Sequence, residues 1–179
     1  VLPQGYLEAP VLSLEKRVKL ESLGDNLKVG VVWAGNPSHI NDSRRSMCFD
    51  DIAPLLNIEK PTLVNLQMGE RANQLWNHPQ AQAVINGVEE GVSALSTASL
   101  VKELDLVITV DTFVAHLCGA LGVPTWILVA RNPDWRWLGK GSESAWYKSV
   151  RLFRQGESSS WGPVVTEVIE AIAKMTLDR

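Results

Sequence analysis

Short runs of apolar residues, separated by segments with helical spacing, constrain the fold of this chain most strongly. Residues 106–110 read Leu-Val-Ile-Thr-Val, without the alternation of polar and apolar side chains that a half-exposed strand shows. A strand that is apolar on both sides is typical of a parallel sheet whose two faces are both covered. Similar runs recur along the chain and alternate with helix-like segments, so we predict an α/β domain.

The alternation gives a definite set of elements. The expected strands are residues 27–35, 62–69, 106–110, 125–130 and 150–155, with a short, weak strand around 83–87. The expected helices are residues 49–58, 70–76, 96–105, 113–122 and 163–175. The short connections imply right-handed crossovers, and we predict a Rossmann-like parallel sheet with helices on both faces. We interpret residues 1–26 as a lead-in or interdomain linker and residues 27–179 as the domain itself.

Composition and charge exclude several classes of partner. The chain has 179 residues, 45% of them hydrophobic, which suits one sizeable core. Its net charge of −3 provides no basic field, so nucleic acid is not expected as a partner. No apolar run has the length of a membrane span, and residues 1–20 show no signal peptide. Cys48 and Cys118 lie far apart, which favours two reduced thiols in a cytoplasmic protein, with a disulfide as the alternative.

Candidate binding residues follow the first two expected strands. In open parallel sheets, ligands bind beyond the carboxyl ends of the strands. A glycine there allows close approach to a ligand, and a guanidinium group can pair with phosphate oxygens. Two surface arginines in a solvated loop, and a simple turn after the second strand, are the alternatives. The candidates after these two strands are Gly35, Asn36, Arg44, Arg45, Gln67 and Gly69.

A third candidate group follows the strand at 106–110. Asp111 and Thr112 occupy the position of a helix N-cap, and the helix that begins at Phe113 presents its first N–H groups to any anion above it. His116 lies on the helix face opposite the apolar stripe, towards the same end as the two arginines. An imidazole there could donate to a phosphate or sugar oxygen. Helix capping and a solvated histidine are the structural alternatives, which spacing alone leaves open.

Other common site patterns are absent from the sequence. It contains neither the dinucleotide fingerprint G-x-G-x-x-G nor a P-loop, which removes the usual support for hydride transfer or nucleotide hydrolysis. Asp50 and Asp51 open an expected helix, so we interpret them as capping residues. No His, Cys and carboxylate cluster has the spacing of a metal site, and we expect no metal and no cofactor.

The segment between the last two strands is rich in tryptophan. Trp135, Trp137 and Trp146 could line a platform for a nucleotide or a sugar. Packing against the sheet end or against another domain is the alternative that we favour, because aromatic rings bury large areas where layers meet.

Several motifs resemble one known family. The stretch VDTFVAHLCGALGVPTWILVA (110–130) resembles the D-T-x-x-x-H-L-x-G-A-L-G-x-P element of heptosyltransferase-like glycosyltransferases, classified as family 9. The stretches VGVVWAGNPSHINDSRRS, DLVITVDT, PDWRWL and WYKSVRLFRQ resemble, more closely, the C-terminal halves of bacterial tetratricopeptide-repeat proteins that carry such a domain. The resemblance covers about residues 27–175.

The resemblance implies a GT-B architecture, in which two Rossmann-like domains face a cleft and the C-terminal one holds a nucleotide-sugar donor. It implies metal-independent transfer, with the nucleoside-diphosphate sugar as substrate. Asp111, Thr112 and His116 would fall in the element that holds the donor phosphates, with Phe113 where the family usually has a small residue. The basic residue of the family would fall on Arg44 or Arg45.

The match departs from the family in two respects. The Trp-Pro pair that follows the basic residue in the family is Ser46-Met47 here, which leaves the sugar nucleotide undefined. The family places its general base in an N-terminal domain, which this sequence lacks. The implied partners are therefore the donor and that missing domain, with tetratricopeptide repeats in the same protein. The chain alone should bind a nucleotide and turn over little or nothing.

Two other functions stay open. A binding or scaffold protein would keep the fold without transfer. A sugar-nucleotide epimerase of the same architecture would need catalytic groups for which only Asp111 and His116 are candidates. The parallel sheet should place residues 34–37, 67–69, 111–113 and 130–133 at one edge, which the proposed donor site requires.

Overall fold

The sheet has the strand order of a Rossmann fold. The computed structural model describes residues 5–89, 91 and 93–177. Within them, six parallel strands pair in the order β3-β2-β1-β4-β5-β6, which is the doubly wound order. They are β1 (Leu27–Val32), β2 (Pro61–Asn65), β3 (Ile85–Asn86), β4 (Leu106–Val110), β5 (Thr125–Val129) and β6 (Val150–Arg154). The predicted Rossmann-like α/β class is confirmed.

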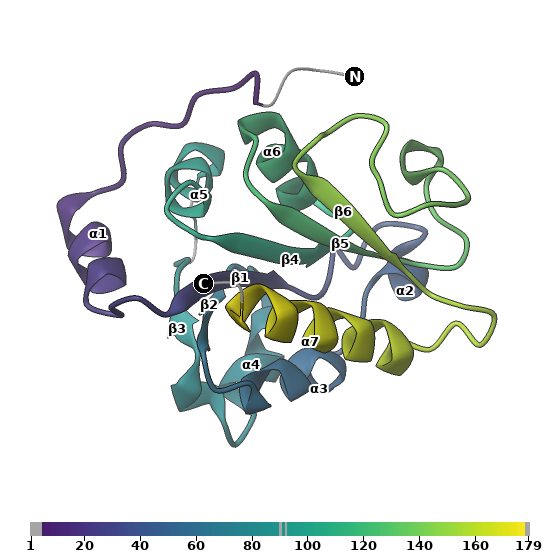
Figure 1. Ribbon diagram of the computed structural model, residues 1–179, viewed down its shortest axis with the longest axis horizontal. Helices are drawn as coiled ribbons and strands as arrows, with labels where there is room; N and C mark the ends of the chain where they lie inside the picture. Colours follow the sequence, from purple (N-terminus) through teal and green to yellow (C-terminus); the bar gives the residue numbers. More distant parts are fainter. Residues whose placement is uncertain (1–4, 90, 92, 178–179) are drawn as a thin grey trace.

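Helices cover both faces of this sheet. Figure 1 shows α5 and α6 on one face and α3, α4 and α7 on the other. The α-helices are α1 (Leu14–Glu21), α2 (Asp42–Arg45), α3 (Phe49–Ile52), α4 (Asn73–Trp76), α5 (Ala94–Val101), α6 (Phe113–Leu121) and α7 (Gly162–Leu177). The 3-10 helices are η1 (Ala53–Asn57), η2 (Glu70–Ala72), η3 (Ala81–Ala83) and η4 (Trp135–Trp137). No helix in the described ranges combines the length and the apolar character needed to cross a bilayer.

Strand β4 shows why the apolar runs do not alternate. Ile108 and Val110 belong to the core beneath α3 and α7, whereas Val107 belongs to the core beneath α5 and α6. All five residues of β4 are buried. Because both faces of the strand are covered, apolar side chains are needed on both, as the sequence indicated.

Some predicted elements are shorter or less regular in the structure. The helix expected over 49–58 is α3 followed by the 3-10 turn η1, because Pro54 has no N–H to donate within a continuous α-helix. The helix expected over 70–76 is likewise η2 followed by α4. The strand expected around 83–87 is the two-residue β3. Arg44 and Arg45, expected in a loop, end the one-turn helix α2.

The lead-in packs against the domain. The backbone N–H groups of Tyr6 and Leu7 both donate to the carbonyl oxygen of Ala120, at 2.8 and 3.1 Å, near the end of α6. Leu12 and Leu20 are buried in the core beneath α5 and α6. Residues 5–26 are therefore part of the packed structure rather than a detached tether.

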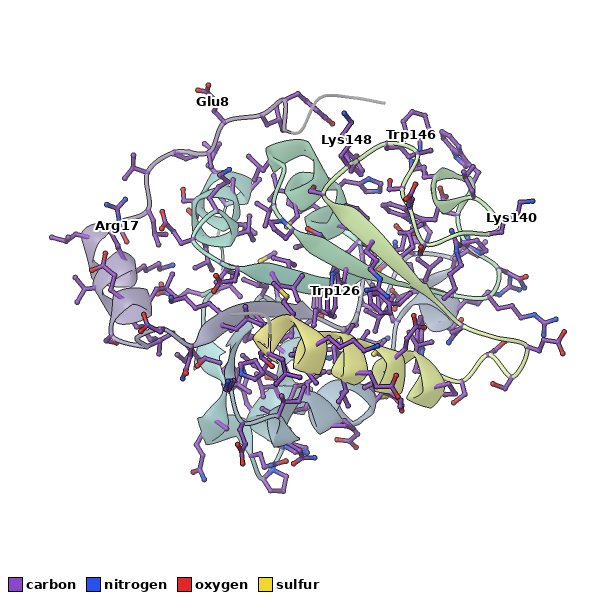
Figure 2. All side chains as sticks on the ribbon, viewed as in Figure 1. Glu8, Arg17, Trp126, Lys140, Trp146 and Lys148 are labelled. Atoms are coloured by element: carbon purple, nitrogen blue, oxygen red, sulfur yellow. The ribbon has the colours of Figure 1, made fainter. Side chains whose placement is uncertain are left out.

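The parallel register gathers the carboxyl ends of the strands at one edge. β1 pairs with β2 and with β4, which makes the gap between β1 and β4 the point where the strand order reverses. Residues 34–37, 67–69, 111–113 and 130–133 line neighbouring cavities at this edge, so the prediction that they share it is confirmed. Figure 2 shows Trp146 and Lys140 at one end of the molecule and Arg17, on α1, at the other.

Candidate functional site

Two cavities lie at the carboxyl edge and meet at the start of α6. The β4–β5 cavity has a volume of about 410 Å³ and is lined from 39–45, 111–116 and 129–137. The β1–β2 cavity has a volume of about 650 Å³ and is lined from 32–37, 66–71 and 112–114. Both include Arg45, Thr112 and Phe113 in their walls. Because Phe113 lines both cavities, this 54% exposed residue lies at their boundary.

The structure places every residue predicted for the site in one of these walls. Gly35, Asn36, Gln67 and Gly69 line the β1–β2 cavity. Arg44, Asp111 and His116 line the β4–β5 cavity. The two groups therefore lie in neighbouring walls that have Phe113 in common.

The two arginines that the sequence could not separate have different environments. Arg45 is largely buried, and its Nη1 donates to the carbonyl oxygen of Asp111 at 2.9 Å. A Cβ on Gly35 would fall 2.6 Å from Nη2 of Arg45, so the glycine makes room for this guanidinium. Arg44 is exposed, and within the described residues its side chain has no hydrogen bond or ion pair. Arg45 thus connects α2 to the end of β4, whereas Arg44 keeps its charge available to a ligand.

A buried aspartate that the sequence analysis missed organises this corner. The carboxylate of Asp42 accepts from Oγ of Ser46 at 2.8 Å and from Nη2 of Arg71 at 3.1 Å. It also lies 3.6 Å from Nε of Arg45. Oγ of Ser46 in turn accepts from the backbone N–H of Gly35 at 2.9 Å. A single acid among the basic and hydroxyl residues of the stretch DSRRS was the signal for this network.

The hydroxyl of Thr112 already has a partner in the protein. Thr112 is the N-cap of α6, but its side chain makes no capping hydrogen bond. Its Oγ1 lies 3.0 Å from Oγ1 of Thr109, and the Thr109 hydroxyl donates to the carbonyl oxygen of Val110 at 2.9 Å. A hydroxyl has one proton, so Thr112 must donate to Thr109. Thr112 therefore faces a ligand with acceptor lone pairs only, and the anion-binding capacity of this corner lies in the helix N–H groups.

Gln67 uses its carboxamide to hold the ends of two strands together. Its Oε1 accepts from the backbone N–H groups of Trp33 and Ala34, at 3.2 and 2.9 Å. Its Nε2 donates to the carbonyl oxygen of Met68 at 3.1 Å. The residue is buried. Gly69 follows with a φ of 71°, a conformation that favours glycine.

His116 is half-buried and held by ring contacts. Its imidazole stacks on Trp137, with ring centroids 5.0 Å apart and an angle of 20° between the planes. Its Nδ1 lies 3.1 Å from the hydroxyl of Tyr147, and its Nε2 lies 3.9 Å from Oδ1 of Asp111. Burial lowers the pKa of His116; the Asp111 carboxylate opposes this effect and Arg136 adds to it. The alternative of a merely solvated histidine does not fit these contacts.

The three tryptophans of the loop before β6 differ in exposure. Trp137 is 1% exposed and packs on His116, whereas Trp135 and Trp146 are 65% and 40% exposed. Those two rings meet edge to face, with centroids 5.8 Å apart. Trp137 therefore packs within this chain, as favoured from the sequence, whereas packing of Trp135 and Trp146 against another domain stays a prediction. The indole Nε1 of Trp137 is a buried donor without a hydrogen-bond partner.

Arg154 holds this loop in place. Its guanidinium donates to the carbonyl oxygens of Leu138 at 3.0 Å and Gly141 at 2.6 Å, and also to that of Trp137. Several carbonyl groups of one loop therefore converge on a single charge, which fixes the position of Trp137 over His116.

The other candidate positions have structural roles. Oδ2 of Asp51 accepts from the backbone N–H of Cys48 at 2.9 Å, in a capping box at the start of α3. Cys48 and Cys118 are both free, and burial raises the pKa of Cys118 to about 12. In the part of the chain that the structure describes, no group of three or more His, Cys, Asp or Glu side chains could hold a metal ion.

Comparisons with known proteins give one sequence relative and one structural neighbour of interest. No protein-family model matches the chain. It is 28% identical over 161 residues to the protein FlbA of Caulobacter vibrioides, an alignment that spans 87% of this chain and 26% of FlbA. The chain therefore spans about a quarter of the length of that curated relative.

The structural neighbour is the ADP-heptose lipopolysaccharide heptosyltransferase II of E. coli. The superposition has a TM-score of 0.60 at 16% sequence identity, and it covers 99% of this chain and 56% of the neighbour. At this level of identity, the similarity shows the fold alone. Its near-complete coverage shows that this chain has the Rossmann-like α/β fold found in a heptosyltransferase.

Proposed function

We propose that this chain is the nucleotide-sugar-binding domain of a GT-B glycosyltransferase, with a nucleoside-diphosphate sugar as its donor. The observation that carries the proposal is the β4–β5 cavity, where a guanidinium, an imidazole and a helix N-terminus converge beside the strand switch point between β1 and β4. The fold shared with a heptosyltransferase supports the proposal, because that enzyme's name specifies ADP-heptose as its donor.

The β4–β5 cavity has the polar groups that a diphosphate needs. Arg44 and Arg136 line it together with Arg45, against the two carboxylates of Asp111 and Asp134. Asp134 is paired with Arg136 at 2.8 Å, and Arg45 with the buried Asp42. Among the three guanidinium groups of this wall, that of Arg44 has no carboxylate partner in the described residues. Because Arg44 and the first N–H groups of α6 share this wall, the diphosphate would bind between them.

The β1–β2 cavity suits an uncharged part of the donor. Its walls include the apolar side chains of Val32, Leu66 and Val114, and Phe113 lies at its border with the other cavity. Two amide residues line this wall: Gln67 is bonded to the backbone, and Oδ1 of Asn36 accepts from the backbone N–H of Ser38. A nucleoside or sugar ring would therefore gain mainly from apolar contact there.

The chemical role proposed for the chain is stabilisation of a leaving group. As the glycosidic bond breaks, negative charge builds on the nucleoside diphosphate. Arg44, the N–H groups at the start of α6 and Nε2 of His116 would neutralise that charge without a metal ion, each by up to a few kcal/mol. The acceptor and its general base would come from another domain of the same protein, and the chain alone would turn over little or nothing.

A thermal-shift screen tests the proposal. Nucleoside diphosphates, their sugars and the corresponding monophosphates would be added to the purified chain, and the melting temperature measured. We expect one diphosphate series to raise the melting temperature more than its monophosphate, because the second phosphate reaches Arg44. A matched variant, Arg44→Ala, should lose that difference, while Lys148→Ala, away from both cavities, should keep it. If no diphosphate stabilises the parent chain, the domain is a scaffold that kept the fold without the site.

A further inference from the structure

Three aromatic and polar contacts fix the ring of His116 and leave one of its nitrogens beside the β4–β5 cavity. Trp137 covers one face of the ring, and the Tyr147 ring approaches at 6.0 Å and 64°. Nδ1 meets the Tyr147 hydroxyl, and Tyr147 is not part of the cavity wall. Nε2 is the nitrogen near Asp111, which does line that wall. The ring therefore has one nitrogen on the protein side and one on the cavity side.

The chain makes specific room for Tyr147. Gly119 follows His116 by three residues on α6, so the two positions share one side of the helix. A Cβ on Gly119 would fall 2.4 Å from the ring of Tyr147, which no real contact allows. Glycine weakens a helix interior, so a close contact is a physical reason for finding it there. The contact that it permits is the one that brings the phenol to His116.

The electrostatics decide which nitrogen carries the proton. A neutral imidazole has one N–H donor and one acceptor nitrogen. The Asp111 carboxylate, 3.9 Å from Nε2, favours the proton on Nε2 and would repel a lone pair there. Nδ1 is then the acceptor, and the Tyr147 hydroxyl donates to it. The other charged groups around the ring are Arg136 and Asp134, from the tryptophan loop.

We propose that Tyr147 is a positioning residue that holds Nδ1 of His116, so that the Nε2–H group is presented to a phosphate oxygen in the β4–β5 cavity. The proposal rests on the function inferred above, because it assigns the ligand of that same cavity. Tyr147 does not touch the ligand and acts only through His116.

The test uses Tyr147→Phe, which keeps the ring against Gly119 and removes only the hydroxyl. The first readout is an NMR titration of the histidine side chains without any ligand. The Tyr147 hydrogen bond stabilises the neutral imidazole, so its loss should raise the pKa of His116. His39 and His78, whose Nδ1 atoms accept from the backbone N–H groups of Asn41 and Gln80, are internal references that should not change.

The second readout is a double-mutant cycle with inorganic pyrophosphate as the probe, measured by calorimetry at pH 8. Tyr147→Phe and His116→Gln should each weaken binding about threefold to tenfold, the size of one hydrogen bond. The double variant should bind no more weakly than His116→Gln alone. Lys148→Ala, which changes an exposed side chain of the same loop outside the cavity wall, should bind as the parent does.

The outcomes separate the two proposals. Additive losses in the cycle, or an unchanged pKa of His116 in Tyr147→Phe, would overturn the positioning role. If pyrophosphate binds to none of the proteins but the pKa of His116 rises, the contact exists and the proposed donor site does not.

Discussion

The two cavities at the carboxyl edge differ in how the protein uses its polar atoms. In the β1–β2 cavity, the carboxamide of Gln67 is bonded to the backbone on both sides. In the β4–β5 cavity, the guanidinium of Arg44 and Nε2 of His116 keep donors for a ligand. Both cavities share the start of α6. A position at the carboxyl edge of the sheet therefore identifies candidate site residues. Whether their donors and acceptors are free then distinguishes a residue that binds a ligand from one that holds the strands together.

Loss of Gln67 should have the largest effect on stability. Gln67→Met keeps the length of the side chain but leaves the N–H groups of Trp33 and Ala34 without their acceptor. We expect the free energy of unfolding to fall by about 2–4 kcal/mol, because buried donors lose their partner. Chemical denaturation measures this change, with the exposed Gln80→Met as the control. A stable Gln67→Met protein with impaired nucleotide binding would reverse the roles assigned to the two cavities.

Gly119→Ala should have the second-largest effect on stability. Its Cβ would overlap the Tyr147 ring, which must move away from α6 and so away from His116. We expect a loss of about 1–3 kcal/mol in the free energy of unfolding, the usual effect of overpacking. Gly139→Ala is the matched control, since no atom lies within 4 Å of its Cβ position. If Gly119→Ala leaves the free energy of unfolding unchanged, the Tyr147 ring does not pack closely against α6.

Thr112→Val should affect stability and not binding. It removes the hydrogen bond to Thr109, and we expect a loss of about 1 kcal/mol in the free energy of unfolding. Nucleotide affinity per folded molecule should stay within about twofold, because the hydroxyl proton is already used inside the protein. Calorimetry on folded protein checks this, with the exposed Thr166→Val as the control. Weaker binding by Thr112→Val at full folding would return Thr112 to the set of ligand donors.

The smallest expected effect is a pH dependence from His116. Its pKa is lower in the folded chain than its ordinary value of 6.5. The unfolded chain therefore binds the proton more readily, and stability should fall as the pH drops through 6.5 towards the folded pKa. Denaturation at pH 7.5 and pH 5 should show a smaller decrease for His116→Gln than for the parent. An equal decrease in both proteins would mean that other groups cause the pH dependence.

The sequence predicted the sheet well because burial on both faces imposes a simple pattern. Strand β4 has the predicted bounds, since every residue of 106–110 is buried. The same logic placed the candidate residues at one edge. It missed the change from α-helix to a 3-10 turn at Pro54, although a proline without an N–H inside the expected helix was a visible signal for it.

The details of the candidate site depend on side-chain directions that spacing does not encode. Arg44 and Arg45 are adjacent in sequence, and only the structure shows that Arg45 turns inward to Asp111. Tyr147 lies 31 residues from His116, and no local pattern connects them. One signal was available for this contact. A glycine at 119, in the interior of α6, indicates that another group approaches closely.

Calorimetric titration of Arg44→Ala tests the central claim most directly. The ligand is the nucleoside diphosphate that stabilises the parent most, and Lys140→Ala is the control for loss of a surface charge. The account predicts that Arg44→Ala keeps the parent's melting temperature but binds about 10- to 100-fold more weakly, because a charge-assisted contact is lost. Equal affinity of Arg44→Ala and the parent would contradict the assignment of the β4–β5 cavity to the donor diphosphate.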